Sequence, residues 1–102
     1  MKNYRTHDDY LNKALKDPKE AALYMNAAVE ENDPALMLAV LAQVVRAHGI
    51  SKMAKKISLS RAGVYKTLSK KGNPELKTFM GILSASGLEM SFKPSHTQHH
   101  VH

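Results

Sequence analysis

Apolar residues recur every three or four positions through most of the chain, which is the spacing of one face of an α-helix. The dipeptides Asp17-Pro18 and Asp33-Pro34 divide the first half, because aspartate caps a helix start and proline suits the first helical position. The pattern predicts helices over 7–16, 18–32 and 34–49. Their expected apolar stripes are Tyr10, Leu11, Ala14 and Leu15 in the first, and Leu23, Tyr24, Ala27 and Ala28 in the second.

The stretch 34–49 is apolar on almost every side, as expected for a central buried helix, and Gly49 is its natural stop. Shorter helices are predicted over 51–57, 60–70 and 74–85, with Ser51, Ser60 and Asn73 at or just before their starts. Gly72 and Gly87 provide stops.

Residues 88–93 alternate between apolar and polar side chains, which predicts a short β-strand. A lone strand in a helical chain needs a partner, and the same strand of a second copy would supply one. The alternative is an extended tail that packs against its own domain. The first reading predicts a homodimer.

Two of the short helices form a corner with an apolar inner side. Met53, Ala54 and Ile57 lie on one face of 51–57, and Val64 and Leu68 on one face of 60–70. Leu59 fills the connection between them. This spacing predicts a helix-turn-helix, whose second helix enters the major groove of DNA with its N-terminus first.

Charge is distributed unevenly along the chain. The net charge is +6, but residues 1–33 sum to −2 and residues 34–102 to +8. The stretch 51–74 holds seven basic residues and no acidic one. Simple solvation of a small domain is one explanation, and an electrostatic footprint for a polyanion is the other.

The residues that we predict to contact DNA lie on the outer side of the corner. Arg61 can donate two hydrogen bonds to guanine O6 and N7, whereas the lysines suit contacts with phosphates. Ser60 and the free N–H groups of its helix start can take a phosphate. For Tyr65, core packing and DNA contact stay open as alternatives. The full set is Ser51, Lys52, Ser60, Arg61, Ala62, Tyr65, Lys66 and Lys70.

Other classes of protein have little support. There is no cysteine, no apolar run of membrane-spanning length and no signal-peptide core, so we expect a cytoplasmic protein without a membrane segment. No nucleophile–base spacing, metal motif or phosphate loop is present, so we expect no enzyme, metal or cofactor. RNA binding has little support, because the sequence shows no exposed aromatic platform on which unpaired bases could stack. The histidine-rich residues 94–102 are expected to form a disordered tail.

The stretch "GISKMAKKISLSRAGVYKTLSKKGNPELKTFMGILSASGLEMSF" resembles the Cro/C1-type (XRE) helix-turn-helix of the probable addiction-module antidote proteins, which are HigA-like type II antitoxins. The resemblance covers roughly residues 8–92. It implies an all-α, five-to-six-helix, lambda-repressor-like domain with a short C-terminal strand that pairs across a homodimer. Residues 1–33 would be a helical extension packed on the DNA-binding domain of 34–93.

The same resemblance implies an antitoxin that neutralises a RelE/ParE-superfamily toxin and represses its own operon by binding an operator palindrome. A basic toxin would meet acidic side chains of the first third; solubility and helix starts are the other explanation for these acids, which are Asp8, Asp9, Asp17, Glu20, Glu30 and Glu31. A stand-alone phage- or chromosome-type repressor is the alternative function.

Two positions depart from the family pattern. Many motifs of this type have glycine where Ser58 stands, because the turn often needs positive φ. A serine can be accommodated there, at a modest cost, if the turn is slightly different. Gly63 lies inside the recognition helix, where it weakens the helix by about 1 kcal/mol relative to alanine. It would also allow close approach of the backbone to DNA.

Overall fold

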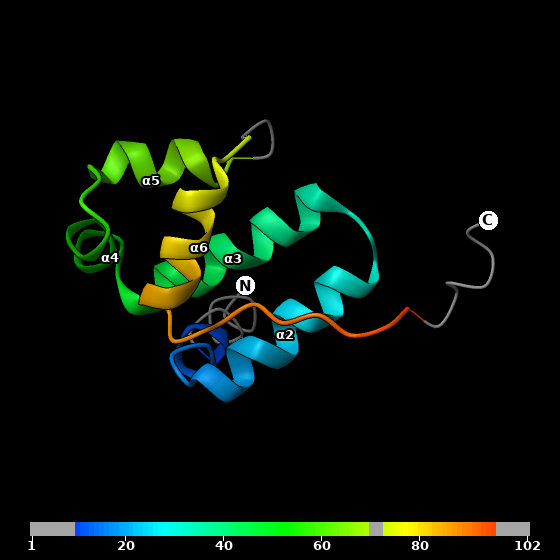
Figure 1. Ribbon diagram of the computed structural model, residues 1–102. Coiled ribbons are helices and arrows are strands. Elements are labelled where there is room, and N and C mark those ends of the chain that lie inside the picture. The colour runs from blue at the N-terminus through cyan, green and yellow to red at the C-terminus, as the bar shows by residue number, and fades with distance from the viewer. Residues whose placement is uncertain (1–9, 70–72, 96–102) are drawn as a thin grey trace.

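The computed structural model describes residues 10–69 and 73–95, and the regular structure in them is entirely helical (Figure 1). A short helical stretch over 10–14 precedes five longer elements. These are α2 (Pro18–Glu30), α3 (Pro34–His48), α4 (Ile50–Lys56), α5 (Arg61–Thr67) and α6 (Leu76–Ala85). The helical class expected from the sequence agrees with this architecture.

Both aspartate–proline dipeptides begin helices as predicted. The Asp17 carboxylate accepts a hydrogen bond from the backbone N–H of Lys19 at 3.0 Å, and Pro18 is the first residue of α2. The Asp33 carboxylate accepts from the N–H of Ala35 at 3.0 Å and that of Leu36 at 3.4 Å. Each carboxylate therefore satisfies backbone donors that the helix itself leaves open.

The core lies around α3, which packs along α2 and joins it through a three-residue connection (Figure 1). Leu41, Val44 and Val45 of α3 are completely buried, as expected for a central helix. One hydrophobic cluster joins them to Leu15 before α2 and to Ile82 of α6. Burial of apolar surface in this single cluster holds the helices together.

The predicted apolar stripe of α2 is wrong except at Ala28. Ala21, Met25 and Ala28 are the buried residues of this helix, whereas Leu23 is 65% and Tyr24 37% exposed. Apolar residues occupy so many positions of α2 that several stripes fit the helical spacing. Packing against α3 selects the face with two alanines, because small side chains let the two helix axes approach closely.

Gly49 separates α3 from α4 and turns the chain by 99° between the two helix axes. Its φ of +102° lies in a region that side-chain-bearing residues rarely adopt, which explains a glycine here. Gly49 also precedes α4 directly, so this helix starts at Ile50 rather than Ser51. No single helix in the described ranges is long and apolar enough to span a membrane. Taken together, α3 and α4 have the length and composition of a membrane span, but the 99° bend at Gly49 lies between them.

The end of α6 fixes the direction in which the chain leaves the core. Gly87 adopts a φ of +82°, and the backbone N–H of Leu88 donates to the carbonyl of Leu83 at 2.8 Å. This pairing closes the helix end in the manner of a Schellman motif. Gly87 lies next to Pro18, since a Cβ added there would be 3.2 Å from the proline ring.

The predicted strand over 88–93 is not formed in the single chain. Residues 88–95 carry neither helix nor strand, and 89–94 make no backbone hydrogen bond to another described residue. A strand requires a hydrogen-bonded partner, and the described part of one chain offers none. The predictions for the helix start at Asn73 and helix end near Lys70 also shift: α6 begins at Leu76, and α5 ends at Thr67.

Candidate nucleic-acid interface

The inner side of the α4–α5 corner is buried as the sequence predicted. Met53 and Ala54 of α4 are 1% and 4% exposed, and Val64 of α5 is completely buried. Leu68 closes the same side just beyond α5. Because both inner faces belong to the main hydrophobic cluster, the relative position of the two short helices is fixed by core packing.

The connection between the two helices is a tight turn over 57–60. The backbone N–H of Leu59 donates to the carbonyl of Ala54 at 2.9 Å, and Ser58 adopts a φ of +58°. The turn therefore keeps the left-handed conformation that usually calls for glycine. The sequence prediction of a slightly different turn at Ser58 is wrong, since the serine itself takes up the unfavourable conformation.

Ser60 caps α5. Its hydroxyl oxygen accepts a hydrogen bond from the backbone N–H of Gly63 at 2.9 Å. The N–H groups of Arg61 and Ala62 have no partner among the described residues. Two backbone donors at the start of α5 thus remain open to an acceptor from outside the chain.

The side chains predicted to contact DNA are on the surface. Arg61, Ala62 and Lys66 of α5 are exposed, and Tyr65 is 45% exposed, which favours the outward position over core packing for this tyrosine. On α4, Ser51 and Lys52 are exposed in the first turn. Lys70 lies outside the described residues. The structure therefore brings Arg61, Ala62, Tyr65 and Lys66 together on one short helix and places the α4 pair on its neighbour.

The helices that form this surface, α3 to α5, carry no acidic side chain, and the nearest acid in the sequence, Glu75 before α6, lines a pocket together with Lys66. No aspartate or glutamate occurs between Asp33 and Glu75, while exposed basic residues lie on three consecutive helices. Arg46 in the last turn of α3 is an exposed addition that the sequence reading did not include. Arg46 lies in the last turn before Gly49 and α4, and this closeness to the predicted two-helix corner could have indicated it as a DNA-contact candidate. Along the described chain, no acidic side chain forms an ion pair that would neutralise these cations.

The electrostatic effect of these lysines is felt by His48, at the end of α3. Burial lowers the pKa of His48 below its ordinary value of 6.5, and the positive charges of Lys56, Lys52 and Lys16 lower it further. The Nε2 atom of this ring is buried without a hydrogen-bond partner. The imidazole is therefore held in its neutral form beside a positive surface.

Gly63 faces the corner rather than the solvent. A Cβ added at this position would lie 3.2 Å from the Ser60 hydroxyl oxygen and 3.7 Å from the Leu59 side chain. The glycine thus makes room for the cap of its own helix. This contact gives a structural reason for Gly63 that does not involve close approach to DNA.

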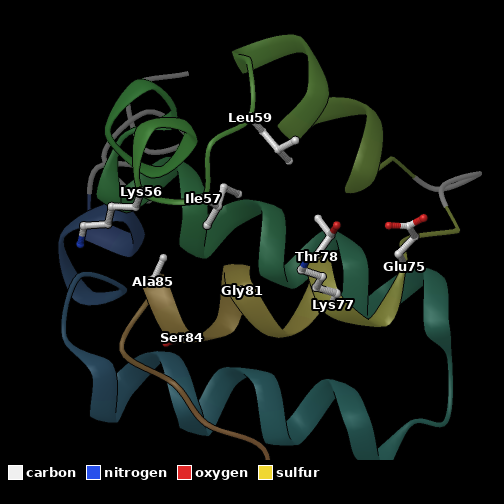
Figure 2. A pocket seen from close by; sticks show the side chains of 9 residues that line it. All are labelled: Lys56, Ile57, Leu59, Glu75, Lys77, Thr78, Gly81, Ser84 and Ala85. Atoms are coloured by element: carbon white, nitrogen blue, oxygen red, sulfur yellow. The ribbon is translucent and has the colours of Figure 1, made fainter.

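A groove of about 540 Å³ separates the α4–α5 connection from α6 (Figure 2). Ile57 and Leu59 line one wall, and Gly81 and Ala85 of α6 line the other. Charged residues, among them Lys56, lie at the margin. The groove exists because α6 packs on α4 while its contact with α5 is slight.

The described residues contain no group of three or more histidine, aspartate or glutamate side chains placed to hold a metal ion. The tail histidines, His96, His99, His100 and His102, lie outside the described residues. The described chain thus identifies no metal-binding residues.

The exposed side of α2 carries a second feature that the sequence did not predict. Leu23 projects from the side of α2 opposite its buried stripe, where Glu20 and Glu30 flank it. We call these residues, with Ala27, the α2 outer face. Once Ala21, Met25 and Ala28 are known to be the buried stripe, helical spacing puts Leu23 on the opposite side.

The fold and the surface together define a small helical domain with a basic, exposed two-helix corner. Comparison with known families identifies it further: a sequence profile described as "Probable addiction module antidote protein" matches residues 6–94. The chain belongs to this family. Membership implies an antidote role in an addiction module and hence a cognate toxin as partner.

A relative from Haemophilus influenzae strain Rd is 35% identical over 81 residues, which is 79% of this chain and 84% of the relative. That relative carries only the name "Uncharacterized protein". No solved structure matches significantly.

Proposed function

We propose that this chain is the antitoxin of a type II toxin–antitoxin module, that it binds the operator of its own operon as a homodimer, and that it neutralises a RelE/ParE-superfamily toxin. DNA binding would use α4 and α5 as a Cro/C1-type (XRE) helix-turn-helix. The observation that carries the proposal is the corner itself. Its inner side is buried in the core, and its outer side presents Arg61, Tyr65 and Lys66 in a stretch without acids.

In this proposal the exposed groups have different tasks. Arg61 is the first residue of α5, so its guanidinium can reach guanine O6 and N7 when the helix enters the major groove end-on. The open N–H groups of Arg61 and Ala62 can receive a phosphate oxygen. Lys52, which is exposed on α4, would contact the flanking DNA backbone and add affinity without sequence information.

Binding to duplex DNA tests these roles by substitution. We expect Arg61→Ala to weaken binding to the upstream promoter by about 1–3 kcal/mol and to relax preference at one base pair. Lys52→Ala should weaken all sequences alike and reduce the salt dependence. Lys19→Ala on α2 is the matched control, because this lysine is exposed but remote in sequence from the corner. Unchanged promoter affinity of both corner variants would rule out groove entry by α5.

The acidic residues proposed for the toxin contact differ in what they do in the described chain. Asp17 caps α2 through the backbone N–H of Lys19, so the helix-start explanation accounts for this residue. Glu20, Glu30 and Glu31 are exposed and make no ion pair in the described chain. Asp8 and Asp9 lie outside the described residues.

The α2 outer face is the surface that we propose for the toxin. An exposed leucine flanked by free carboxylates combines an apolar anchor with a negative rim, which complements a basic partner. Leu23→Ser should abolish rescue of growth when the chain is co-expressed with the adjacent toxin gene. Leu76→Ser is a close control, because Leu76 has the same 65% exposure but lies on α6.

Rescue by both variants would contradict the assignment of the toxin to α2. The same co-expression experiment separates an antitoxin from a stand-alone repressor. A module predicts a toxic reading frame beside this gene, whereas a repressor without a toxin predicts promoter binding and no toxic neighbour.

A further inference from the structure

The segment that follows α6 carries an exposed aromatic side chain beside an unfilled apolar cavity. Phe92 is 90% exposed, more than any other large apolar residue of the described chain. The cavity, of about 290 Å³, opens between the last turns of α6 and this segment. It is lined by Met80, Leu83, Ser84, Leu88, Glu89 and Met90.

We propose that Phe92 of one copy fills this cavity in a second copy, and that the exchange is reciprocal across a two-fold axis. This inference rests on the homodimer of the proposed function and names the contact that would form it. The cavity exceeds the roughly 150 Å³ that accommodates a benzene molecule in an engineered protein interior. A two-fold contact needs one patch to carry both the knob and the hole, and residues 80–92 carry both.

The ring of Phe92 does not pack within its own chain. Leu88 is tied to the end of α6 by its N–H bond to the Leu83 carbonyl, so the following residues leave the helix in a fixed direction. Met90 then lines the cavity, but Phe92, two residues further, has left it. The part of the tail that packs on its own domain therefore ends before Phe92, whose ring is exposed.

Antiparallel pairing of two such segments would deliver Phe92 to the partner's cavity. Directly opposite residues in an antiparallel pair lie on the same face, and Leu88, Met90 and Phe92 share one face by alternation. With the two-fold axis at Met90, Phe92 lies opposite Leu88 of the other copy; with the axis at Ser91, it lies opposite Met90. Both of these partners line the cavity.

Charge and backbone chemistry favour the same pairing. Glu89 lies diagonal to Lys93 of the other copy in the first register and directly opposite it in the second, so opposite charges meet in both. An axis at Glu89 would set two carboxylates against each other. The backbone groups of 89–93 have no partner in the described chain, and Pro94, which lacks an N–H, ends the pairing.

Single-cysteine variants test the contact directly, because the chain has no cysteine of its own. A residue on the two-fold axis lies opposite the same residue of the second chain. Met90→Cys or Ser91→Cys should therefore form an intermolecular disulfide under mild oxidation. Leu23→Cys, on α2, is the control that should stay reduced. Crosslinking of neither axis variant, or equal crosslinking of the α2 control, would overturn the proposal.

Sedimentation equilibrium gives the second measurement. The 11.3 kDa chain should dimerise, and Phe92→Ala should raise the dissociation constant at least about tenfold, as expected for an aromatic anchor. Phe92 is too exposed to support the fold, so the variant should keep its thermal unfolding midpoint at a protein concentration below dimerisation. A monomer at all concentrations, or a dimer unaffected by Phe92→Ala, would refute the inference.

These outcomes differ from failure of the proposed function. A crosslinkable dimer that ignores promoter DNA would disprove the operator role and leave the Phe92 contact standing. Promoter binding by a chain that crosslinks at neither position would support the operator role and disprove the Phe92 contact. A monomer whose toxin binding is weakened by Phe92→Ala would assign this cavity to the toxin and overturn the proposal.

Discussion

The hydroxyl oxygen of Ser60 accepts the backbone N–H of Gly63 at 2.9 Å, and an added Cβ on Gly63 would lie 3.2 Å from that same oxygen. The cap of α5 and the glycine within its first turn therefore depend on each other. A serine cap stabilises the helix by about 1 kcal/mol, while glycine in place of alanine weakens it by a similar amount. The sequence therefore combines a favourable cap at Ser60 with a residue of low helix propensity at Gly63.

A double-mutant cycle measures this dependence. Gly63→Ala alone should raise the free energy of unfolding by less than the ~1 kcal/mol of an unhindered helix position, since the new methyl crowds the cap. In a Ser60→Ala background the crowding oxygen is gone, and the gain from Gly63→Ala should exceed the first by at least ~0.5 kcal/mol. Urea unfolding of the four proteins gives both values. Equal gains would mean that the two residues act independently.

Gly81 offers the matched comparison within α6. A Cβ added there would meet only the Ile57 side chain, at 3.9 Å, which is ordinary contact across the groove of Figure 2. Gly81→Ala should therefore raise the free energy of unfolding by about 1 kcal/mol, because it restores helix propensity without crowding. Chemical denaturation checks the value. A loss of stability would show that the groove wall cannot accept a methyl group.

Ser58 provides a third test through its φ of +58°. Ser58→Gly should raise the free energy of unfolding by about 0.5–1 kcal/mol, because glycine adopts this conformation without steric conflict. Asn32, with a φ of +57°, is the control. Asparagine tolerates the left-handed region, so Asn32→Gly should give a smaller gain. Thermal unfolding of both variants compares them, and a larger gain at position 32 would contradict the strain at Ser58.

The sequence predicts best where one physical requirement dominates. The start of α3 follows from Asp33-Pro34, and its burial follows from an apolar run that only an interior position can satisfy. The inner side of the corner, from Met53 to Leu68, follows from spacing alone.

The failures have different causes. The buried face of α2 could not be chosen among overlapping apolar stripes without knowing that α3 approaches closely enough to require Ala21 and Ala28. The strand over 88–93 depends on a partner that a single chain does not contain. The positive φ of Ser58 accompanies the hydrogen bond from the backbone N–H of Leu59 to the carbonyl of Ala54, which closes the end of α4, and this turn overrides the local preference of serine.

His48 should make the stability of the folded chain depend on pH. Because burial and three lysines lower the pKa of His48 in the folded chain, the unfolded chain binds more protons near pH 6. Stability should be complete above the ordinary pKa of 6.5 and should fall as the pH drops below it. His48→Gln should flatten this dependence, measured as the free energy of unfolding in urea between about pH 5.5 and 7.5. Since burial is the larger cause, the difference between the two proteins should persist in about 0.5 M salt, which screens the lysine charges. Parallel pH curves for the two proteins would show that this half-buried ring does not titrate differently on folding.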